Sequence, residues 1–126
     1  MKHVLVVDDN QTDRFLTRAL VQKLGYVVYE VFDGSKVEHA LKLVTPNLII
    51  MDLLMPNKDG FETLEEIHQK APDIPVIVLS CVGDEYKDKV MKLNAKACFQ
   101  KPYDANEFIK TIQELVEEGD LNQPDQ

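Results

Sequence analysis

The stretch "LIIMDLLMPNKDG", residues 48–60, begins as an apolar run and ends in a turn. Its apolar residues show no polar alternation, which is typical of a strand buried on both faces of a sheet. A carboxylate, Asp52, stands where the run stops, and an apolar Leu54 follows two residues later. A buried strand that ends on an acid predicts that the acid lies at the edge of the sheet where ligands bind.

Four other short apolar runs resemble this one, and helix-length amphipathic stretches separate them. The five predicted strands are residues 4–7, 27–32, 48–51, 76–79 and 97–99. Two of the predicted helices begin with capping residues, in "NQTD" at 10–13 and "DANE" at 104–107. The order βαβαβαβαβα predicts an α/β fold, a doubly wound parallel sheet covered by helices on both faces.

Length, charge and cysteine content limit the class of protein. The 126 residues suit one domain, which we expect over residues 1–118, followed by a polar, flexible tail over 119–126. The net charge of −8 argues against direct binding to nucleic acid or to an anionic membrane. No apolar run approaches the length of a membrane span. Cys81 and Cys98 have neither metal-site nor disulfide-framework spacing, so we expect a cytoplasmic protein with reduced thiols.

Polar residues follow four of the predicted strands. They are Asp8, Asp9, Asp52, Ser80 and Lys101. If the first and third strands are neighbours, the three carboxylates share a pocket, where two charges about 4 Å apart repel by roughly 4 kcal/mol at an effective dielectric near 20. Either some of these carboxylates protonate, or a cation joins them. Oxygen ligands favour Mg²⁺ or Mn²⁺ over zinc, and Lys101 would add a positive charge on the far side.

Such a site would bind a phosphoryl group well. The metal ion and Lys101 would neutralise its oxygens, Ser80 would donate a hydrogen bond, and an aspartate would serve as the nucleophile. The sequence shows no Gly-rich phosphate loop and no adenine pocket, so a partner would have to deliver the phosphoryl group. Each residue alone also fits an ordinary cap or turn, and the signal lies in their combination.

The stretches that carry this combination resemble the response-regulator receiver domain of two-component signalling. They are "VLVVDDN" (4–10), "LIIMDLLMPNKDG" (48–60), "PVIVLS" (75–80) and "KPY" (101–103). The resemblance covers residues 2–118 and implies a flavodoxin-like sheet with strand order 2-1-3-4-5. It also implies that Asp52 is the phospho-acceptor, supplied by a phosphohistidine on a sensor histidine kinase or a phosphotransfer protein.

The resemblance further implies a set of metal ligands. Asp9 and Asp52 would bind Mg²⁺ directly, together with the backbone carbonyl of Leu54. Asp8 would act mainly through a metal-bound water. Mn²⁺ would be able to take the place of Mg²⁺.

Docking and output are implied in the same way. Ser80 would hydrogen-bond the phosphoryl group and move on activation, and Lys101 would pair with it, beside a cis bond to Pro102. The kinase would dock on the first helix and on the loop around Pro102 and Tyr103. The signal would leave through the fourth helix, fifth strand and fifth helix, toward a downstream protein, an effector domain beyond Gln126 or a homodimer partner.

Several positions depart from the family's common pattern. Cys98 stands where an aromatic switch residue is usual, which leaves the output coupling open. Cys81 replaces a smaller alanine beside the serine, and Asn94 stands where glycine is common, although asparagine tolerates the left-handed conformation. The side chains of Leu54 and Val82 tune hydrolysis of the acyl phosphate in this family. Both are apolar, so we expect slow autodephosphorylation.

Three other classes compete with this interpretation. A haloacid-dehalogenase-type phosphatase needs a second aspartate where the chain has Leu54. A flavodoxin-like cofactor carrier needs a Ser/Thr-rich phosphate loop where the chain has Asp8 and Asp9, which would repel a phosphate. A degenerate receiver used only for docking is disfavoured by the intact acidic, serine and lysine set, although Cys98 keeps it open.

Overall fold

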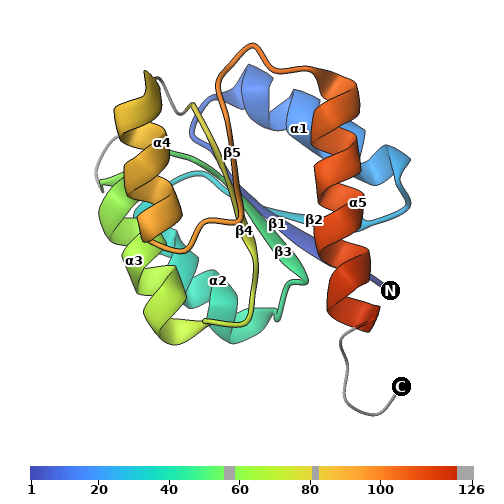
Figure 1. Ribbon diagram of the computed structural model, residues 1–126. Coiled ribbons are helices and arrows are strands. Elements are labelled where there is room, and N and C mark those ends of the chain that lie inside the picture. The colour runs from blue at the N-terminus through green and yellow to red at the C-terminus, as the bar shows by residue number, and fades with distance from the viewer. Residues whose placement is uncertain (56–58, 81–82, 122–126) are drawn as a thin grey trace.

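A five-stranded parallel sheet forms the centre of the molecule (Figure 1). The computed structural model describes residues 1–55, 59–80 and 83–121. The strands are β1 (His3–Val7), β2 (Val27–Val31), β3 (Leu48–Asp52), β4 (Val76–Leu79) and β5 (Ala97–Phe99). They pair in the order β2-β1-β3-β4-β5, and each of these neighbouring pairs is parallel. The predicted fold class and strand order are confirmed.

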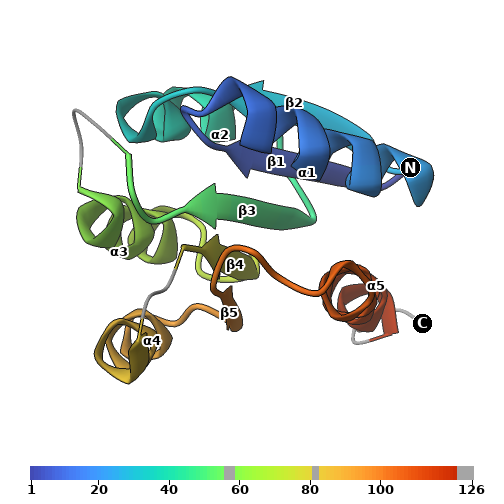
Figure 2. The same cartoon turned by 90° about the horizontal axis from the view of Figure 1, so that it is seen from above.

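Helices cover both faces of the sheet, as predicted. They are α1 (Gln11–Lys23), α2 (Val37–Leu43), α3 (Gly60–Lys70), α4 (Gly83–Lys92) and α5 (Ala105–Leu121), with a short 3₁₀ helix η1 (Gly34–Lys36) before α2. Figure 2 shows α1 and α5 on one face and α2, α3 and α4 on the other. This arrangement leaves the carboxyl ends of the strands uncovered between the helices.

Each face of the sheet has its own apolar core because side chains alternate along the strands. Leu5 and Ile49 pack toward α2, α3 and α4, whereas Val4 and Ile50 pack toward α1 and α5. All five residues of β3 are buried. A fully buried Leu or Ile side chain stabilises a fold by roughly 1.5–3 kcal/mol, so β3 is a rigid support for its last residue.

The parallel register brings the ends of three strands to the same level. Val7 pairs with Met51, so the residues that follow them, Asp8 and Asp52, lie on neighbouring strands at the same edge. Because β4 ends opposite Asp52, Ser80 comes next to this edge. The register alone therefore assembles most of the predicted site.

Local signals at the helix ends also match the sequence. The Asn10 side chain accepts a hydrogen bond from the N–H of Asp13 at 2.9 Å, and the Asp104 side chain accepts one from the N–H of Glu107 at 3.0 Å. Both predicted caps are confirmed. Asn94 has φ 74°, the left-handed conformation expected at this position.

The connection from β3 to α3 passes very close to the helix start. A Cβ added at Gly60 would collide with the carbonyl oxygen of Leu53, so this position requires glycine. The Asp59 side chain caps α3 by accepting a hydrogen bond from the N–H of Phe61 at 2.8 Å. Residues 56–58 of this connection lie outside the described residues.

The last helix continues beyond the predicted end of the domain. Helix α5 runs to Leu121, so the first three residues of the predicted tail are helical. Residues 122–126 lie outside the described residues, and the flexible tail stays a prediction. Within the described part of the chain, no helix combines the length and apolarity needed to cross a membrane.

Candidate functional site

Asp52 is the last residue of β3, and only 5% of it is exposed. Its Oδ1 accepts a hydrogen bond from the backbone N–H of Leu54 at 2.9 Å. Its Oδ2 accepts one from Lys101 Nζ at 2.8 Å. Charge-assisted bonds of this kind are short and directional, so both carboxylate oxygens are held in place.

Asp8 is even more buried than Asp52, with 1% of the residue exposed. Its Oδ1 accepts a hydrogen bond from the backbone N–H of Asn10 at 2.9 Å, and Lys101 Nζ lies 3.4 Å from its Oδ2. Burial raises the pKa of Asp8 above its usual value, and the nearby Asp52 charge adds to this effect. The Asn10 N–H and the Lys101 charge oppose the shift without cancelling it. The predicted repulsion between like charges therefore contributes, together with burial, to the raised pKa of Asp8.

Lys101 lies among the carboxylates, not on the far side of them as predicted. Its Nζ is 2.8 Å from Asp52, 2.9 Å from Asp13 and 3.4 Å from Asp8. Burial alone would lower the pKa of Lys101. The bonds to Asp52 and Asp13 and the attraction of the Asp52 and Asp8 charges outweigh burial and raise that pKa. The ammonium sits centrally because three carboxylates attract it. The peptide bond between Lys101 and Pro102 is cis, as expected.

Asp13 is the site residue that the sequence analysis missed. The "NQTD" pattern marked it only as the acid of a helix cap. The N–H of Asn10, which a capping acid would bond, instead donates to Asp8. The Asp13 carboxylate is therefore available to Lys101, which it contacts at 2.9 Å. Its place on the first turn of α1, shortly after the paired acids, was the one signal for this role.

Three carboxylates are close enough to hold a cation. Single oxygens of Asp8, Asp13 and Asp52 all lie within 4.8 Å of one another. A set made only of carboxylate oxygens fits a hard divalent ion such as Mg²⁺. Asp9 is exposed and is not part of this group, so its predicted role and that of the Leu54 carbonyl stay predictions.

Two further predicted residues adjoin the site. Ser80 directly follows β4 and has φ 67°, a conformation that non-glycine residues rarely adopt and that often marks functional sites. The Leu54 side chain is 62% exposed, so it stands where solvent can approach Asp52. Val82, the other residue linked to hydrolysis, lies outside the described residues.

An apolar groove lies beside the site. We call it the α1 groove; it has a volume of about 710 Å³ and runs between α1 and the segment that joins β5 to α5. Its lining includes Leu16, Leu20, Pro102 and Tyr103, together with Asp13 and Lys101. The groove and the charged site therefore share two side chains.

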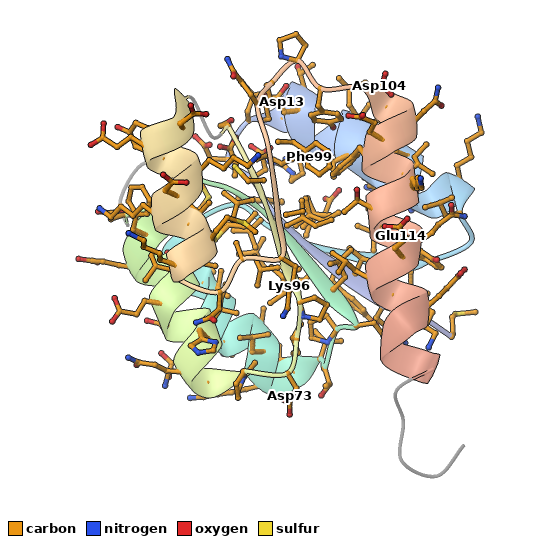
Figure 3. All side chains as sticks on the ribbon, viewed as in Figure 1. Asp13, Asp73, Lys96, Phe99, Asp104 and Glu114 are labelled. Carbon is orange, nitrogen blue, oxygen red and sulfur yellow. The ribbon has the colours of Figure 1, made fainter. Side chains whose placement is uncertain are left out.

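Cys98 corrects one expectation. It is disulfide-bonded in the structure, whereas the cysteine spacing predicted reduced thiols. The only other cysteine in the sequence, Cys81, lies outside the described residues. In the sheet, Cys98 of β5 is paired with Val78 of the neighbouring strand β4. The spacing of residues along the chain does not reveal this neighbour. The next side chain, Phe99, points to the opposite face, where it contacts Tyr103 (Figure 3).

The doubly wound sheet, with buried acids and a lysine at its carboxyl edge, defines a class of small α/β domains suited to phosphoryl chemistry. Comparison with known proteins is more specific. The model of the response regulator receiver domain family matches residues 4–113. The chain therefore belongs to this family, whose members act in two-component signalling as phospho-acceptors and not as turnover enzymes.

Individual relatives agree with this assignment. Response regulator RR06 of Streptococcus pneumoniae is 39% identical over 115 residues, which are 90% of this chain and 52% of that protein. The DNA-binding dual master transcriptional regulator RpaA of Synechocystis sp. is 28% identical over 95% of this chain and 51% of that protein. The chain thus spans about half the length of both. A CheY-like receiver domain structure from Methanospirillum hungatei has the same fold, with a TM-score of 0.90 at 22% identity, covering 98% of this chain and 99% of that one.

Proposed function

We propose that this domain is a phosphorylation-dependent switch in which Asp52 accepts a phosphoryl group from a phosphohistidine. The donor is a sensor histidine kinase or a phosphotransfer protein. The observation that carries the proposal is the buried Asp52 carboxylate at the end of β3, held by Lys101 Nζ at 2.8 Å. A rigid, oriented carboxylate at the open edge of the sheet is suited to act as a nucleophile.

In the proposed reaction, the phosphoryl group moves from the phosphohistidine of the donor to Asp52. A carboxylate oxygen of Asp52 attacks phosphorus, the phosphorus–nitrogen bond breaks, and its electron pair stays on the imidazole nitrogen of the donor. Asp52 then carries an acyl phosphate. Lys101 turns from the carboxylate to the phosphoryl oxygens, and Ser80 donates a hydrogen bond to them. The chain's own residues orient the acceptor and stabilise the added charge.

Mg²⁺ is the proposed cofactor, and Mn²⁺ is expected to replace it. Asp9 and Asp52 would bind the ion directly, together with the Leu54 backbone carbonyl, and Asp8 would act mainly through a metal-bound water. When bound, the ion supplies positive charge that neutralises phosphoryl oxygens. The closeness of the Asp8 and Asp52 oxygens supports this assignment.

The α1 groove is the proposed docking site for the kinase or phosphotransfer protein. Its apolar lining from α1 and the segment around Pro102 and Tyr103 fits a partner helix. Because Lys101 also lines the groove, a partner docked there would lie next to the phosphorylation site.

The proposed output runs through α4, β5 and α5. Ser80 follows β4 and comes shortly before α4 in the chain, so a shift of this residue on phosphorylation is the proposed way in which the signal reaches that helix. The relatives are about twice as long as this chain, and RpaA is named as a DNA-binding regulator. We propose that an effector domain or a separate downstream protein receives the signal, with homodimerisation through the same face as a further route.

Autodephosphorylation is proposed to be slow. The exposed Leu54 side chain offers no polar group to align a water molecule that attacks the acyl phosphate. Replacing it in Leu54→Asn should shorten the half-life of the phosphorylated protein by about tenfold. Loss of the phosphoryl group from the unsubstituted protein within seconds would contradict this proposal.

Intact-mass spectrometry after incubation with acetyl phosphate tests the central proposal. We expect one added phosphoryl group when Mg²⁺ is present, and none without Mg²⁺ or in Asp52→Asn. Labelling that survives Asp52→Asn, or that proceeds equally well without Mg²⁺, would overturn the site assignment. Size-exclusion chromatography of the labelled protein would then test homodimerisation.

A further inference from the structure

Asp13 belongs both to the charged site and to the α1 groove. Its Oδ2 lies 2.9 Å from Lys101 Nζ, nearly as close as the 2.8 Å contact between that nitrogen and Asp52. The Asp13 side chain is 38% exposed, far more than the 6% of Asp52, and it lines the α1 groove. Asp13 is thus the carboxylate of the site that both solvent and a docked molecule can reach.

Lys101 has a limited capacity for these partners. An ammonium group has three N–H donors, and in this structure they face Asp52, Asp13 and Asp8. If Asp52 carries a phosphoryl group, Lys101 must direct donors to the new oxygens. The bond to Asp13 competes with this reorientation, and an oxygen of Asp13 lies within 4.8 Å of an oxygen of Asp52, the residue that would carry the phosphoryl group.

We propose that Asp13 is a positioning residue that restrains Lys101 and slows phosphoryl acceptance by Asp52. This inference rests on the proposed function and adds a restraint on the rate of phosphoryl acceptance. Asp13 touches none of the reacting atoms in this scheme; it acts through the ammonium group that it holds. The restraint is released when the Asp13 carboxylate is removed or engaged by another cation.

Labelling kinetics of the full chain test this role. Acetyl phosphate at saturating Mg²⁺ is the donor, and the rate of mass gain is measured for Asp13→Asn and for the unsubstituted protein. The amide has the same shape but no charge. We expect Asp13→Asn to react about fivefold faster, which corresponds to about 1 kcal/mol, the range of a part-exposed ion pair.

Matched variants separate this role from general effects of charge or folding. Glu114→Gln removes the same charge from an exposed position on α5 away from the start of α1, and it should react at the original rate (Figure 3). Asp13→Glu keeps a carboxylate that can reach the flexible lysine, and it should stay slow. Asp13→Ser lacks the carboxylate and should be as fast as Asp13→Asn.

Equilibrium binding of beryllofluoride, a phosphoryl mimic, provides a second readout. Asp13→Asn should bind it about fivefold more tightly, because Lys101 is freer to contact it. An Asp13→Asn variant that reacts at the original rate or more slowly, needs more Mg²⁺ for labelling, or is matched by Glu114→Gln would overturn the inference. Loss of labelling in Asp52→Asn in the same series shows that the proposed function holds even if this inference fails.

Discussion

Two lysine–carboxylate pairs in this protein have the same length and different surroundings. Lys101 and Asp52 are 2.8 Å apart with side chains 22% and 6% exposed, and Lys70 and Glu38 are also 2.8 Å apart with side chains 47% and 41% exposed. Interactions with the paired carboxylates raise the pKa of both lysines. The distance alone therefore does not say what a pair contributes to the fold or to function.

The difference lies in what happens when one partner is lost. Water replaces a missing partner at the exposed Lys70–Glu38 pair, so such pairs contribute little. At the carboxyl edge of the sheet, a missing ammonium would leave Asp8 and Asp52 buried and close to each other. Buried charges without partners are strongly unfavourable, so this region depends on a cation.

The largest expected effect on stability comes from Lys101→Ala. It should lower the free energy of unfolding by about 2 kcal/mol, less than a fully buried pair would lose because Lys101 is partly exposed. Urea unfolding in EDTA measures the change. Lys70→Ala removes the same charge from a pair of the same length and should cause no measurable change. Equal losses in the two variants would show that burial does not distinguish the two pairs.

Added Mg²⁺ should stabilise the buried site and leave the exposed pair unaffected. At ten times the dissociation constant, a single bound ion raises the free energy of unfolding by about 1.4 kcal/mol. The gain should be larger in Lys101→Ala, because no ammonium then competes for the carboxylates. Thermal unfolding across a Mg²⁺ titration measures both gains. A gain that persists unchanged in Asp52→Asn would contradict the assigned site.

Asp8→Asn should make the protein more stable at neutral pH in the absence of Mg²⁺. The substitution removes a charge whose burial is unfavourable and that also repels Asp52, which should raise the free energy of unfolding by about 1 kcal/mol. The comparison variant Glu38→Gln should not stabilise the protein, because its carboxylate is exposed and attracts Lys70. Denaturant midpoints at pH 7 provide the test, and a less stable Asp8→Asn would show that the buried Asp8 charge is not unfavourable.

The pH dependence of this effect has a defined sign. The pKa of Asp8 is raised in the folded protein, so its favourable contribution is fully present below the usual value of 3.8 and is lost as pH rises through the raised pKa. The difference between Asp8→Asn and the unsubstituted protein should therefore be largest at neutral pH and shrink toward pH 4. Unfolding midpoints across this range check the trend, which would be absent if Asp8 kept its usual pKa.

The fold could be predicted from the sequence because its strongest local signals, the apolar runs and the acids that follow them, agree with the arrangement of the whole sheet. The uninterrupted apolar run of β3 is buried along its whole length, and acids follow β1 and β3 where the parallel register brings them to one edge. The helix caps at Asn10 and Asp104 agree with the same arrangement. Consistency between local and global signals is what makes such predictions reliable.

The features that the sequence did not predict depend on side-chain competition in space. Lys101 was expected beyond the carboxylates and lies among them, because three charges attract one ammonium. Asp13 was assigned to a helix cap, because its spacing fits both roles and only the structure shows that Asp8 takes the Asn10 N–H. The disulfide at Cys98 was not predicted, because the spacing of cysteines along the chain does not show which residues meet in space.

The most direct test of the account is to locate the phosphoryl group within the chain. Borohydride reduces an acyl phosphate to an alcohol, so a phosphorylated aspartate is converted to homoserine and can be found by peptide mass spectrometry. After incubation with acetyl phosphate and Mg²⁺, we expect this conversion at Asp52 and at no other aspartate. Conversion at Asp8, Asp9 or Asp13, or equal conversion at Asp52 without Mg²⁺, would contradict the central claim.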